Sequence, residues 1–258
     1  MIRWSSLVAF PDFVANTYPM SCQEKNRDTL ISAEENREMF DRIAKNYDAA
    51  NRAISMGMDR GWRRKTVQLL KPFRGGRYLD IGTGTGDLVF EILDQSVNVL
   101  VDGIDPSEQM LAIARDKAAK RGIGDAVSFI SGDALDLPME SKTYDGIVSG
   151  FCFRNIERRQ RALEEMRRVL KPGGLLVILE ATYPESALIR FGYKLYRPLV
   201  PLIGRMMGGG AAYKYLVDSI EDFPRPATVT DMFSAAGFSH VQCTPLTFGT
   251  VCIFSGKR

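Results

Sequence analysis

Residue types that hold metals or form disulfides are scarce in this chain of 258 residues. It contains one histidine, His240, and four cysteines that form no C-x-x-C pair: Cys22, Cys152, Cys243 and Cys252. One histidine and four dispersed cysteines leave no set of zinc ligands, so we predict no metal site. We interpret the cysteines as reduced thiols, which indicates a cytoplasmic compartment.

Long apolar runs are also absent. A helix that spans a bilayer needs roughly 18 uninterrupted apolar residues. The best candidate, residues 187–207, is interrupted by Arg190, Lys194, Arg197, Pro198, Pro201 and Arg205. We therefore predict that no segment crosses a membrane.

Charge of one sign is not in large excess either. The formal net charge is +3, and no basic run marks a nucleic-acid footprint, so we expect no nucleic-acid partner. The charges are spread along predicted helices, which is typical of solvated faces. With 45% hydrophobic residues the chain can bury a full core, and its length fits one large domain or a domain with a cap.

The first 31 residues are not typical of a folded domain. Residues 1–20 are apolar with two prolines and a single arginine, and they lack the charged start and continuous apolar core of a signal peptide. We interpret residues 1–31 as a disordered extension without a catalytic role. An organelle-targeting segment and a translation start at Met20 stay open as alternatives. Residues 32–258 are then expected to form a single domain.

The stretch over residues 77–93 organises the rest of the chain. Apolar strand formers lead into Gly82, Gly84 and Gly86, and a pattern of helical spacing follows. A strand that turns through glycines into a helix places backbone N–H groups at the carboxyl edge of a sheet, where ligands bind in open α/β folds. The glycines permit positive φ and close approach of a ligand.

The spacing of these glycines favours S-adenosylmethionine (SAM) over NAD. A dinucleotide fingerprint needs a third glycine at the position of Asp87. The acidic Asp80 before the loop repels a pyrophosphate but suits a cationic ligand that carries an amine. SAM carries a sulfonium and an ammonium group. A glycine-rich turn without such a ligand is the plain structural alternative.

Helices are predicted before this stretch. Ser32 and Glu35 form a capping box that opens a helical cap over residues 32–72. Tyr47 falls on the apolar face of the first helix, and a second helix is predicted over residues 51–70. Because these helices precede the sheet, they are free to cover its edge. For Tyr47, simple packing is the structural alternative.

Strands and helices alternate after the glycines. We predict strands over residues 97–104, 127–131, 144–149 and 175–179, a helix over 157–170 and a turn over 171–174. Residues 182–224 break the alternation with two helical pieces joined by glycines at 208–210, and we interpret them as a lid. A helix over 228–236 and an antiparallel hairpin over 238–255 close the chain.

Polar residues follow three of the predicted strands. Asp105 lies about 20 residues beyond the glycines, where a carboxylate accepts hydrogen bonds from ribose hydroxyls; a helix cap is the alternative. Asp133 is placed to accept a hydrogen bond from an adenine amino group, with a turn aspartate as the alternative. Residues 150–156 face the same crevice, so we expect a second substrate there.

Together these residues resemble the class I SAM-dependent methyltransferases, through residues 79–87, Asp105, Gly-Asp-Ala at 132–134 and Leu-Lys-Pro-Gly-Gly at 170–174. Three further stretches are similar to the ubiquinone/menaquinone-biosynthesis C-methyltransferases: Phe-Asp-Arg-Ile-Ala-Lys-Asn-Tyr-Asp at 40–48, Gly-Phe-Cys-Phe-Arg-Asn at 150–155, and Tyr-Lys-Tyr-Leu-Val-Asp-Ser-Ile at 213–220. The resemblance covers about residues 36–256.

The resemblance implies a Rossmann-like α/β fold with a seven-stranded, mostly parallel sheet and SAM as the methyl donor. Thr85, Asp105, Asp133 and Ala134 match the family's SAM-binding residues. The expected donor site therefore comprises Asp80, Gly82, Gly84, Thr85, Gly86, Asp105, Asp133, Ala134, Ser149 and Gly150. Gly150 stands where the family often has a serine, and Cys152 where a glycine is usual, so Ser149 is the expected substitute.

The resemblance also implies transfer of a methyl group to a ring carbon of a polyprenylated hydroquinone, such as demethylmenaquinol or a ubiquinol precursor. The ring carbon becomes a good nucleophile when the neighbouring hydroxyl loses its proton, so the site needs a group that stabilises a phenolate. We predict that Arg154 stabilises the phenolate or polarises a water that takes the proton, because its pKa exceeds about 12 and it offers several donors. Asn155 and Tyr47 would complete the hydrogen-bond network. A salt bridge is the structural alternative for Arg154.

The expected partners are a prenylated quinol and, through residues 187–207, the surface of a membrane. A homodimer stays open as an assembly. One alternative function is methylation of another small phenolic or lipid acceptor. A base N-methyltransferase is disfavoured, because Gly-Phe-Cys-Phe stands where Asn-Pro-Pro-aromatic is expected. Asp87 opposes an NAD-dependent oxidoreductase, and the intact glycine loop opposes a non-catalytic scaffold.

Overall fold

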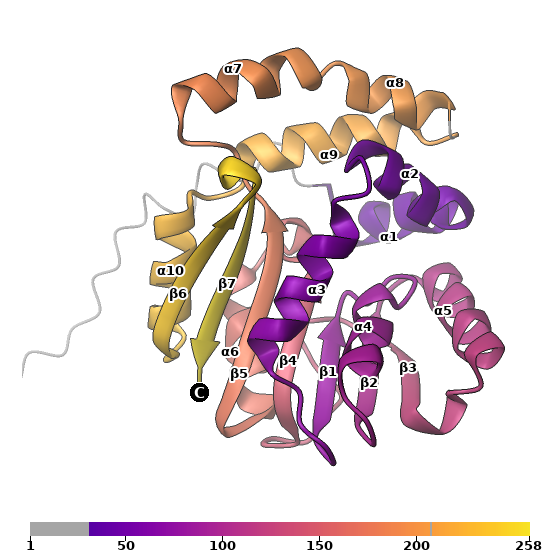
Figure 1. Cartoon of the computed structure of the whole chain (residues 1–258), viewed down its shortest axis with the longest axis vertical. Coiled ribbons are helices and arrows are strands. Elements are labelled where there is room, and N and C mark those ends of the chain that lie inside the picture. The colour runs from indigo at the N-terminus through magenta and orange to yellow at the C-terminus, as the bar shows by residue number, and fades with distance from the viewer. Residues whose placement is uncertain (1–30, 207) are drawn as a thin grey trace, which may run out of the picture.

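The sheet at the centre of the molecule has seven strands in the order β3-β2-β1-β4-β5-β7-β6 (Figure 1). The strands are β1 (Arg77–Ile81), β2 (Leu100–Asp105), β3 (Val127–Ser131), β4 (Tyr144–Gly150), β5 (Leu170–Ala181), β6 (Ser239–Leu246) and β7 (Val251–Lys257). The first five pair in parallel, and β7 runs antiparallel to β5 and β6. The predicted Rossmann-like sheet and its closing hairpin are confirmed.

This computed structural model describes residues 31–206 and 208–258. The predicted extension over residues 1–31 therefore lies outside the described residues except for its last member, as does the alternative start at Met20. In the described part, no helix is long and apolar enough to cross a membrane.

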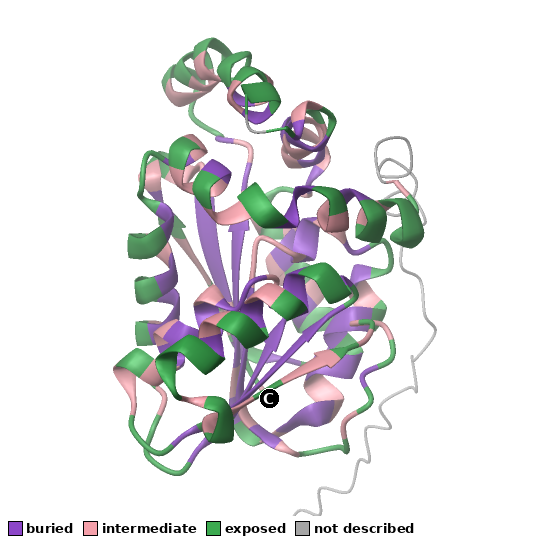
Figure 2. Ribbon diagram, turned by 90° about the vertical axis from the view of Figure 1, so that its right-hand side faces the viewer, coloured by how far each residue is buried: buried purple, intermediate pink, exposed green. Residues whose placement is uncertain are grey.

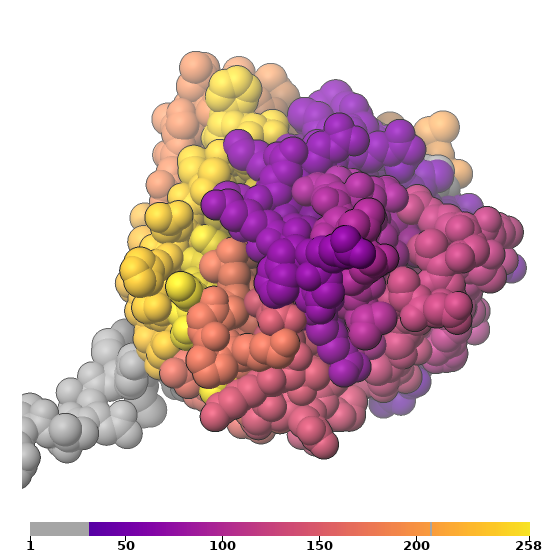
Figure 3. Space-filling view, turned by 60° about the horizontal axis from the view of Figure 1, so that its bottom comes forward, coloured from indigo at the N-terminus to yellow at the C-terminus, as the bar shows by residue number. Residues whose placement is uncertain are grey.

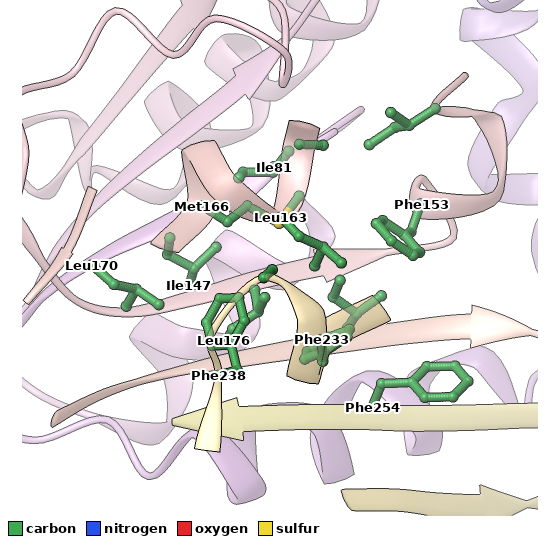
Figure 4. Close-up of a cluster of buried hydrophobic side chains, with 14 of the residues drawn as sticks. Ile81, Ile147, Phe153, Leu163, Met166, Leu170, Leu176, Phe233, Phe238 and Phe254 are labelled. Carbon is green, nitrogen blue, oxygen red and sulfur yellow. The ribbon is translucent and has the colours of Figure 1, made fainter. Parts of the chain in front are cut away.

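Helices cover both faces of the sheet. On one face, α3 (Asp59–Leu70), α4 (Asp87–Gln95) and α5 (Glu108–Arg121) bury apolar residues against the strands. Figure 3, turned so that the bottom of Figure 1 comes forward, shows the segment around α3 between the carboxyl-terminal strands and the region of α4. On the other face, α6 (Arg159–Val169) and α10 (Pro226–Ala235) complete a second core around Ile147, Leu176 and Phe254 (Figure 4).

Five further helices lie beyond the carboxyl ends of the parallel strands (Figure 1). These are α1 (Ala33–Ile43), α2 (Tyr47–Ile54), α7 (Ala187–Tyr196), α8 (Leu199–Met206) and α9 (Gly210–Asp222). Helices α7 and α8 are outermost, and much of their surface is exposed (Figure 2). Ser32 and Glu35 make both hydrogen bonds of the predicted capping box at the start of α1.

The chain differs from the predictions where short-range geometry interrupts a helix or extends a strand. A 3-10 turn at Ala44–Asn46 makes Tyr47 the first residue of α2 rather than a member of α1. The predicted helix over 51–70 is split, because Met56 and Gly57 have positive φ and end α2. The predicted turn over 171–174 belongs to β5, which passes through it with a register shift against β4.

The region predicted as a lid has three helices, not two, because the chain bends again at Pro198 between α7 and α8. Proline favours such a break, since it removes a backbone donor and restricts the residue before it. Smaller differences lie at element ends: β2 begins at Leu100 rather than 97, α6 begins at Arg159 rather than 157, and α10 begins at Pro226 rather than 228.

Candidate active site

The glycine loop follows β1, which lies between β2 and β4 in the sheet. At β1 the strand order reverses, because β2 and β3 are added on one side and β4 and β5 on the other. Ligands bind at such switch points in open α/β folds. Gly82, Gly84 and Gly86 have φ values of +67°, +54° and +88°. A Cβ on Gly82 would lie 2.2 Å from the Sγ of Cys152, so the loop after β4 packs directly on the glycine loop. Only glycine fits at this contact.

Asp80 lies in β1 just before the loop and is 1% exposed. Its Oδ2 accepts a hydrogen bond of 2.8 Å from the Thr83 hydroxyl, whereas its Oδ1 is buried without a partner among the described residues. Burial raises the pKa of Asp80 to about 7. A buried acceptor without a donor is costly, and a cationic ligand group would relieve that cost.

Asp105 ends β2 and fixes the glycine loop. Its Oδ2 accepts from the Gly84 N–H at 2.8 Å, and its Oδ1 accepts from the Ser107 N–H at 2.9 Å. Burial raises the pKa of Asp105 to about 6, although both amide hydrogen bonds favour the ionised form. Each carboxylate oxygen has a second lone pair, so Asp105 retains the capacity to accept from ribose hydroxyls.

A small cavity of about 20 Å³ lies against the glycine loop. Its lining is Tyr47, Arg63, Asp80, Gly82, Thr83, Gly84, Thr85, Asp87, Leu88 and Gly150. Helix α2 is tied to this wall, because the Thr85 hydroxyl donates to Asp48 at 2.6 Å. Lys117 of α5 pairs with Asp48 at 2.5 Å and with Asp87 at 3.2 Å. The helical cap therefore closes one side of the small cavity.

Arg154 lies in the loop after β4 and is held on both sides. The preceding Phe153 is fully buried and packs edge to face on Phe223, which anchors the loop in the core (Figure 4). The Arg154 backbone N–H and Nη1 each donate to Glu180 at 2.9 Å, and Nε donates to Ser219 at 3.3 Å. Burial opposes the charge, but Glu180 outweighs it, and the pKa of Arg154 is raised.

A large cavity of about 400 Å³ lies between the sheet edge and the outer helices α1, α2, α7 and α9. It is lined mainly by apolar and aromatic side chains from α1, α2, α3, α7, α9 and the turn at Thr247–Gly249. Its polar groups include Arg154, Arg63 and five tyrosines: Tyr47, Tyr193, Tyr196, Tyr213 and Tyr215. Two residues, Tyr47 and Arg63, line both cavities, so the two spaces meet there.

Tyr47 is fully protonated at neutral pH in this setting. Burial raises the pKa of its hydroxyl, although Asn51 and the cations of Arg63 and Arg154 act in the opposite direction. A neutral tyrosine at the junction can donate a hydrogen bond.

Of the remaining residues predicted for the donor site, only some line the small cavity. Gly150 lines the small cavity, while Gly86 precedes α4 as its N-cap. The Ser149 hydroxyl donates to the Ile81 carbonyl at 2.7 Å inside the sheet, and Ser149 lines neither cavity. Asp133 is exposed and accepts from the Leu135 N–H, and the adjacent alanine, Ala134, packs on the second core. These two residues lie outside both cavities.

Asn155 is not brought into the predicted network with Arg154 and Tyr47. It lies outside the lining of the large cavity, and its Oδ1 is buried without a partner among the described residues. Phe153 and Ile156 on either side are core residues, so the short 3-10 turn at Phe153–Asn155 directs Arg154 and Asn155 differently.

Comparison with known proteins identifies the family. Residues 28–258 match the ubiE/COQ5 methyltransferase family. The chain belongs to this family. It is 41% identical over 222 residues to demethylmenaquinone methyltransferase of Thermus thermophilus, covering 85% of this chain and all of the relative. It is 38% identical over 224 residues to the ubiquinone/menaquinone biosynthesis C-methyltransferase UbiE of Geobacter sulfurreducens, covering 86% and 88%.

The fold is shared with solved SAM-dependent methyltransferases. A Thermotoga maritima structure described as a possible histamine N-methyltransferase superposes with a TM-score of 0.61 at 21% identity, covering 85% of this chain and 98% of that one. The family match and the two relatives, rather than this shared fold, make the chain a SAM-dependent methyltransferase. Its residues fit the donor, because the buried, unpartnered Oδ1 of Asp80 and the acidic wall suit a ligand with two cationic groups.

Several site residues carry no obvious signal in the sequence. Arg63 lines both cavities, and Glu180 is the buried counter-ion of Arg154. Trp62 lines the large cavity as well. Asp59 and Arg63 stand four residues apart on α3, and their side chains are 5% and 10% exposed. Glu180 is the second-last residue of the fifth parallel strand, and this position near the carboxyl end was the one available clue.

Proposed function

We propose that this ubiE/COQ5-family enzyme methylates a ring carbon of a polyprenylated hydroquinone, either demethylmenaquinol or the corresponding ubiquinol precursor. The observation that carries the proposal is the junction of two unlike cavities. The small one is polar and borders the glycine loop, and the large one is apolar and holds Arg154 and Tyr47. The names of the two relatives support the same acceptor class.

Bound SAM supplies an electrophilic methyl group, so the chain must make the ring carbon nucleophilic and hold it in line. Arg154 cannot serve as a general base, since its pKa is raised and it stays cationic. It can instead donate hydrogen bonds to the ring oxygen that becomes a phenolate, while a water molecule takes the proton of the hydroxyl. The buried position of Arg154 strengthens this interaction relative to water. Tyr47, which stays protonated, donates a second hydrogen bond near the methyl donor.

The Arg154–Glu180 pair has a consequence for this role. Glu180 is fully buried and fixes the guanidinium, so little reorganisation is needed when the phenolate forms. It also neutralises part of the positive charge before the acceptor binds. We therefore assign Arg154 the role of an oriented donor rather than that of a bare cation.

The large cavity suits the head group and the first part of a prenyl tail. Its lining is mostly apolar, and α7 supplies Leu188, Ile189 and Gly192 at its outer side. A cavity of about 400 Å³ holds a ring and a short chain, but a long tail must continue beyond it. We propose that the tail leaves beneath α7.

We also propose that α7 and α8 contact an anionic lipid surface. Six large apolar residues of these helices are between 48% and 83% exposed: Leu188, Phe191, Leu195, Leu199, Leu202 and Met206. They recur every three or four residues, which forms one stripe. Arg190, Lys194 and Arg205 are interleaved with the stripe, and such a pattern is typical of helices that lie on anionic membranes.

Flotation with vesicles tests this contact. We expect the protein to float with vesicles of phosphatidylglycerol and phosphatidylcholine at low salt, and less with phosphatidylcholine alone. The double variant Phe191→Ser, Leu195→Ser should stay in the heavy fraction while it still binds S-adenosylhomocysteine. Absence of the wild-type protein from the anionic vesicles would contradict the proposed surface.

The acceptor is tested by methyl transfer from labelled SAM. We would compare a reduced demethylmenaquinone and a reduced ubiquinone precursor, both with short tails. Label on the naphthoquinol alone indicates a menaquinone-type enzyme, and label on both indicates a dual acceptor range. Label on neither, with donor binding intact, would overturn the acceptor proposal and favour another phenolic or lipid acceptor.

A further inference from the structure

Arg63 is a buried cation at the junction of the two cavities. Its side chain is 10% exposed although it lies on α3 of the helical cap. Nη1 lies 3.1 Å from Asp59, Nε lies 3.6 Å from Asp87, and the guanidinium carbon is 5.5 Å from the centre of the Phe151 ring. These contacts fix the guanidinium against the small cavity.

Among the described residues that line the small cavity, Arg63 alone is positively charged. The other charged groups there are Asp80 and Asp87. Although burial opposes ionisation, the cations of Arg63 and Lys117 lower the pKa of Asp87, which therefore stays ionised. Asp80 carries the unpartnered buried oxygen described above. The cavity thus presents one cation beside an acceptor that lacks a donor.

This arrangement matches the amino-acid end of SAM, which carries an ammonium and a carboxylate on the same carbon. An acidic pocket alone would attract the ammonium and repel the carboxylate. A guanidinium has several N–H donors in a fork that fits a carboxylate, and one hydrogen bond of Arg63, to Asp59, is present in the structure. Donors of Arg63 therefore remain for a ligand.

We propose that Arg63 binds the carboxylate of the methyl donor, while Asp80 accepts from its ammonium. The inference rests on the use of SAM and does not depend on the acceptor. It gives the helical cap a specific task, since α3 contributes a residue that the glycine loop lacks. It also accounts for the position of Arg63 in the wall shared by both cavities.

A purely structural role for Arg63 predicts a different result. In that case Arg63 would only pair with Asp59 on its own helix and tie α3 to α4 through Asp87, and it would not distinguish ligands with and without a carboxylate. The two roles are separated by ligand pairs that differ in this one group. S-adenosylhomocysteine carries the carboxylate, and S-adenosyl-3-thiopropylamine lacks it but keeps the amine.

Isothermal titration of the wild-type protein with both ligands is the first test. We expect S-adenosylhomocysteine to bind about tenfold more tightly or better, because a charge-assisted hydrogen bond to a buried partner is lost with the carboxylate. Equal affinities for the two ligands would overturn the proposal without any variant. Because no acceptor is present, this result does not depend on the proposed quinol chemistry.

Three variants then assign the effect to Arg63. In Arg63→Gln the preference for S-adenosylhomocysteine should fall to within about twofold, while binding of the amine changes little. Arg63→Lys should keep part of the preference, since it retains the charge but loses the fork. Arg64→Gln, on the exposed side of the same helix, should behave as wild type. If Arg63→Gln weakened both ligands equally, Arg63 would be only structural and the proposal would be wrong.

Discussion

The two cavities that meet at Tyr47 and Arg63 differ in volume, in polarity and in how the chain builds them. The small cavity takes most of its lining from one continuous stretch, residues 80–88. The large cavity takes its lining from α1, α2, α3, α7, α9 and three loops, which are far apart in the sequence. One is fixed by backbone conformation and the other by the packing of many elements.

This difference has a functional meaning. A donor that is common to many methyltransferases can be held by a loop whose glycines and carboxylates are local features. An acceptor with an apolar tail needs a larger cavity, which forms only when elements far apart in the sequence pack together. In the proposed arrangement donor and acceptor would meet at the junction residues Tyr47 and Arg63, which line both cavities. Variants that alter one cavity at a time show whether the other cavity is affected.

The largest effect is expected in the large cavity from Arg154→Lys. The variant keeps the charge but loses the planar fork that Glu180 and Ser219 orient. We expect turnover with a quinol acceptor to fall about a hundredfold, as when one donor to a developing oxyanion is removed. Affinity for S-adenosylhomocysteine should change by less than about twofold, since Arg154 does not line the small cavity.

Lysine is the right replacement for Arg154, because an apolar residue would also destabilise the fold and a loss of turnover could then not be assigned to the mechanism. Removing the charge would leave Glu180 buried without its partner, at a cost of about 3 kcal/mol or more in the free energy of unfolding. Thermal unfolding of Arg154→Lys serves as the control. Unchanged turnover in a variant that is folded and binds the donor would remove Arg154 from the mechanism.

Filling the large cavity should give the next largest effect. Gly192 of α7 lines this cavity, and a Cβ there would meet nothing within 4 Å. Gly192→Trp should lower kcat/KM for the quinol about tenfold by occupying the acceptor space. Gly192→Ala is the matched control, because it adds one carbon and stabilises α7 slightly. If both variants kept wild-type kcat/KM, the acceptor would not occupy this cavity.

The same contrast explains what the sequence could predict. The strands and the glycine loop follow from residues that are adjacent in the chain, so their positions were predicted within a few residues. The neighbours of Arg154 could not be found in this way, since Glu180 and Ser219 lie 26 and 65 residues away. Asn155 was predicted to share a hydrogen-bond network with Arg154 and Tyr47, but it does not line the large cavity and its Oδ1 has no partner among the described residues.

The small cavity should show a dependence on pH that the large one lacks. The pKa of Asp80 is raised to about 7 by burial, so the free protein holds a neutral acid in mildly acidic solution. A cationic amine favours the ionised form, and affinity for S-adenosylhomocysteine should therefore rise roughly fivefold between about pH 6 and about pH 7. The ligand amine stays protonated in this range, since the pKa of an α-amine is about 8 or higher.

The stability of the ligand-free protein should change with pH in the opposite direction to the affinity. A raised acid pKa in the folded state stabilises the fold at low pH, and this contribution is lost as the pH rises through about 7. Asp80→Asn should make both the affinity for S-adenosylhomocysteine and the free energy of unfolding independent of pH above pH 6. Below pH 6 the weaker pH dependence that Asp105 causes remains. Titration calorimetry and chemical unfolding across the range measure the two trends. A pH-independent affinity in the wild-type protein would exclude this ionisation from donor binding.

The smallest effect is expected from the tyrosines of the large cavity. The hydroxyl of Tyr213 is buried without a partner among the described residues, whereas the hydroxyl of Tyr196 donates to the Ile54 carbonyl. Tyr213→Phe should therefore raise the ligand-free free energy of unfolding by up to about 1 kcal/mol, because it removes an unsatisfied polar group. Tyr196→Phe should lower it by a similar amount, because it breaks a hydrogen bond. Urea unfolding of both variants measures the two signs. Tyr213 lines the large cavity and its hydroxyl has no partner among the described residues, so the hydroxyl is available to the acceptor and we expect Tyr213→Phe to raise KM for the quinol. An unchanged KM would mean that the hydroxyl has no part in acceptor binding.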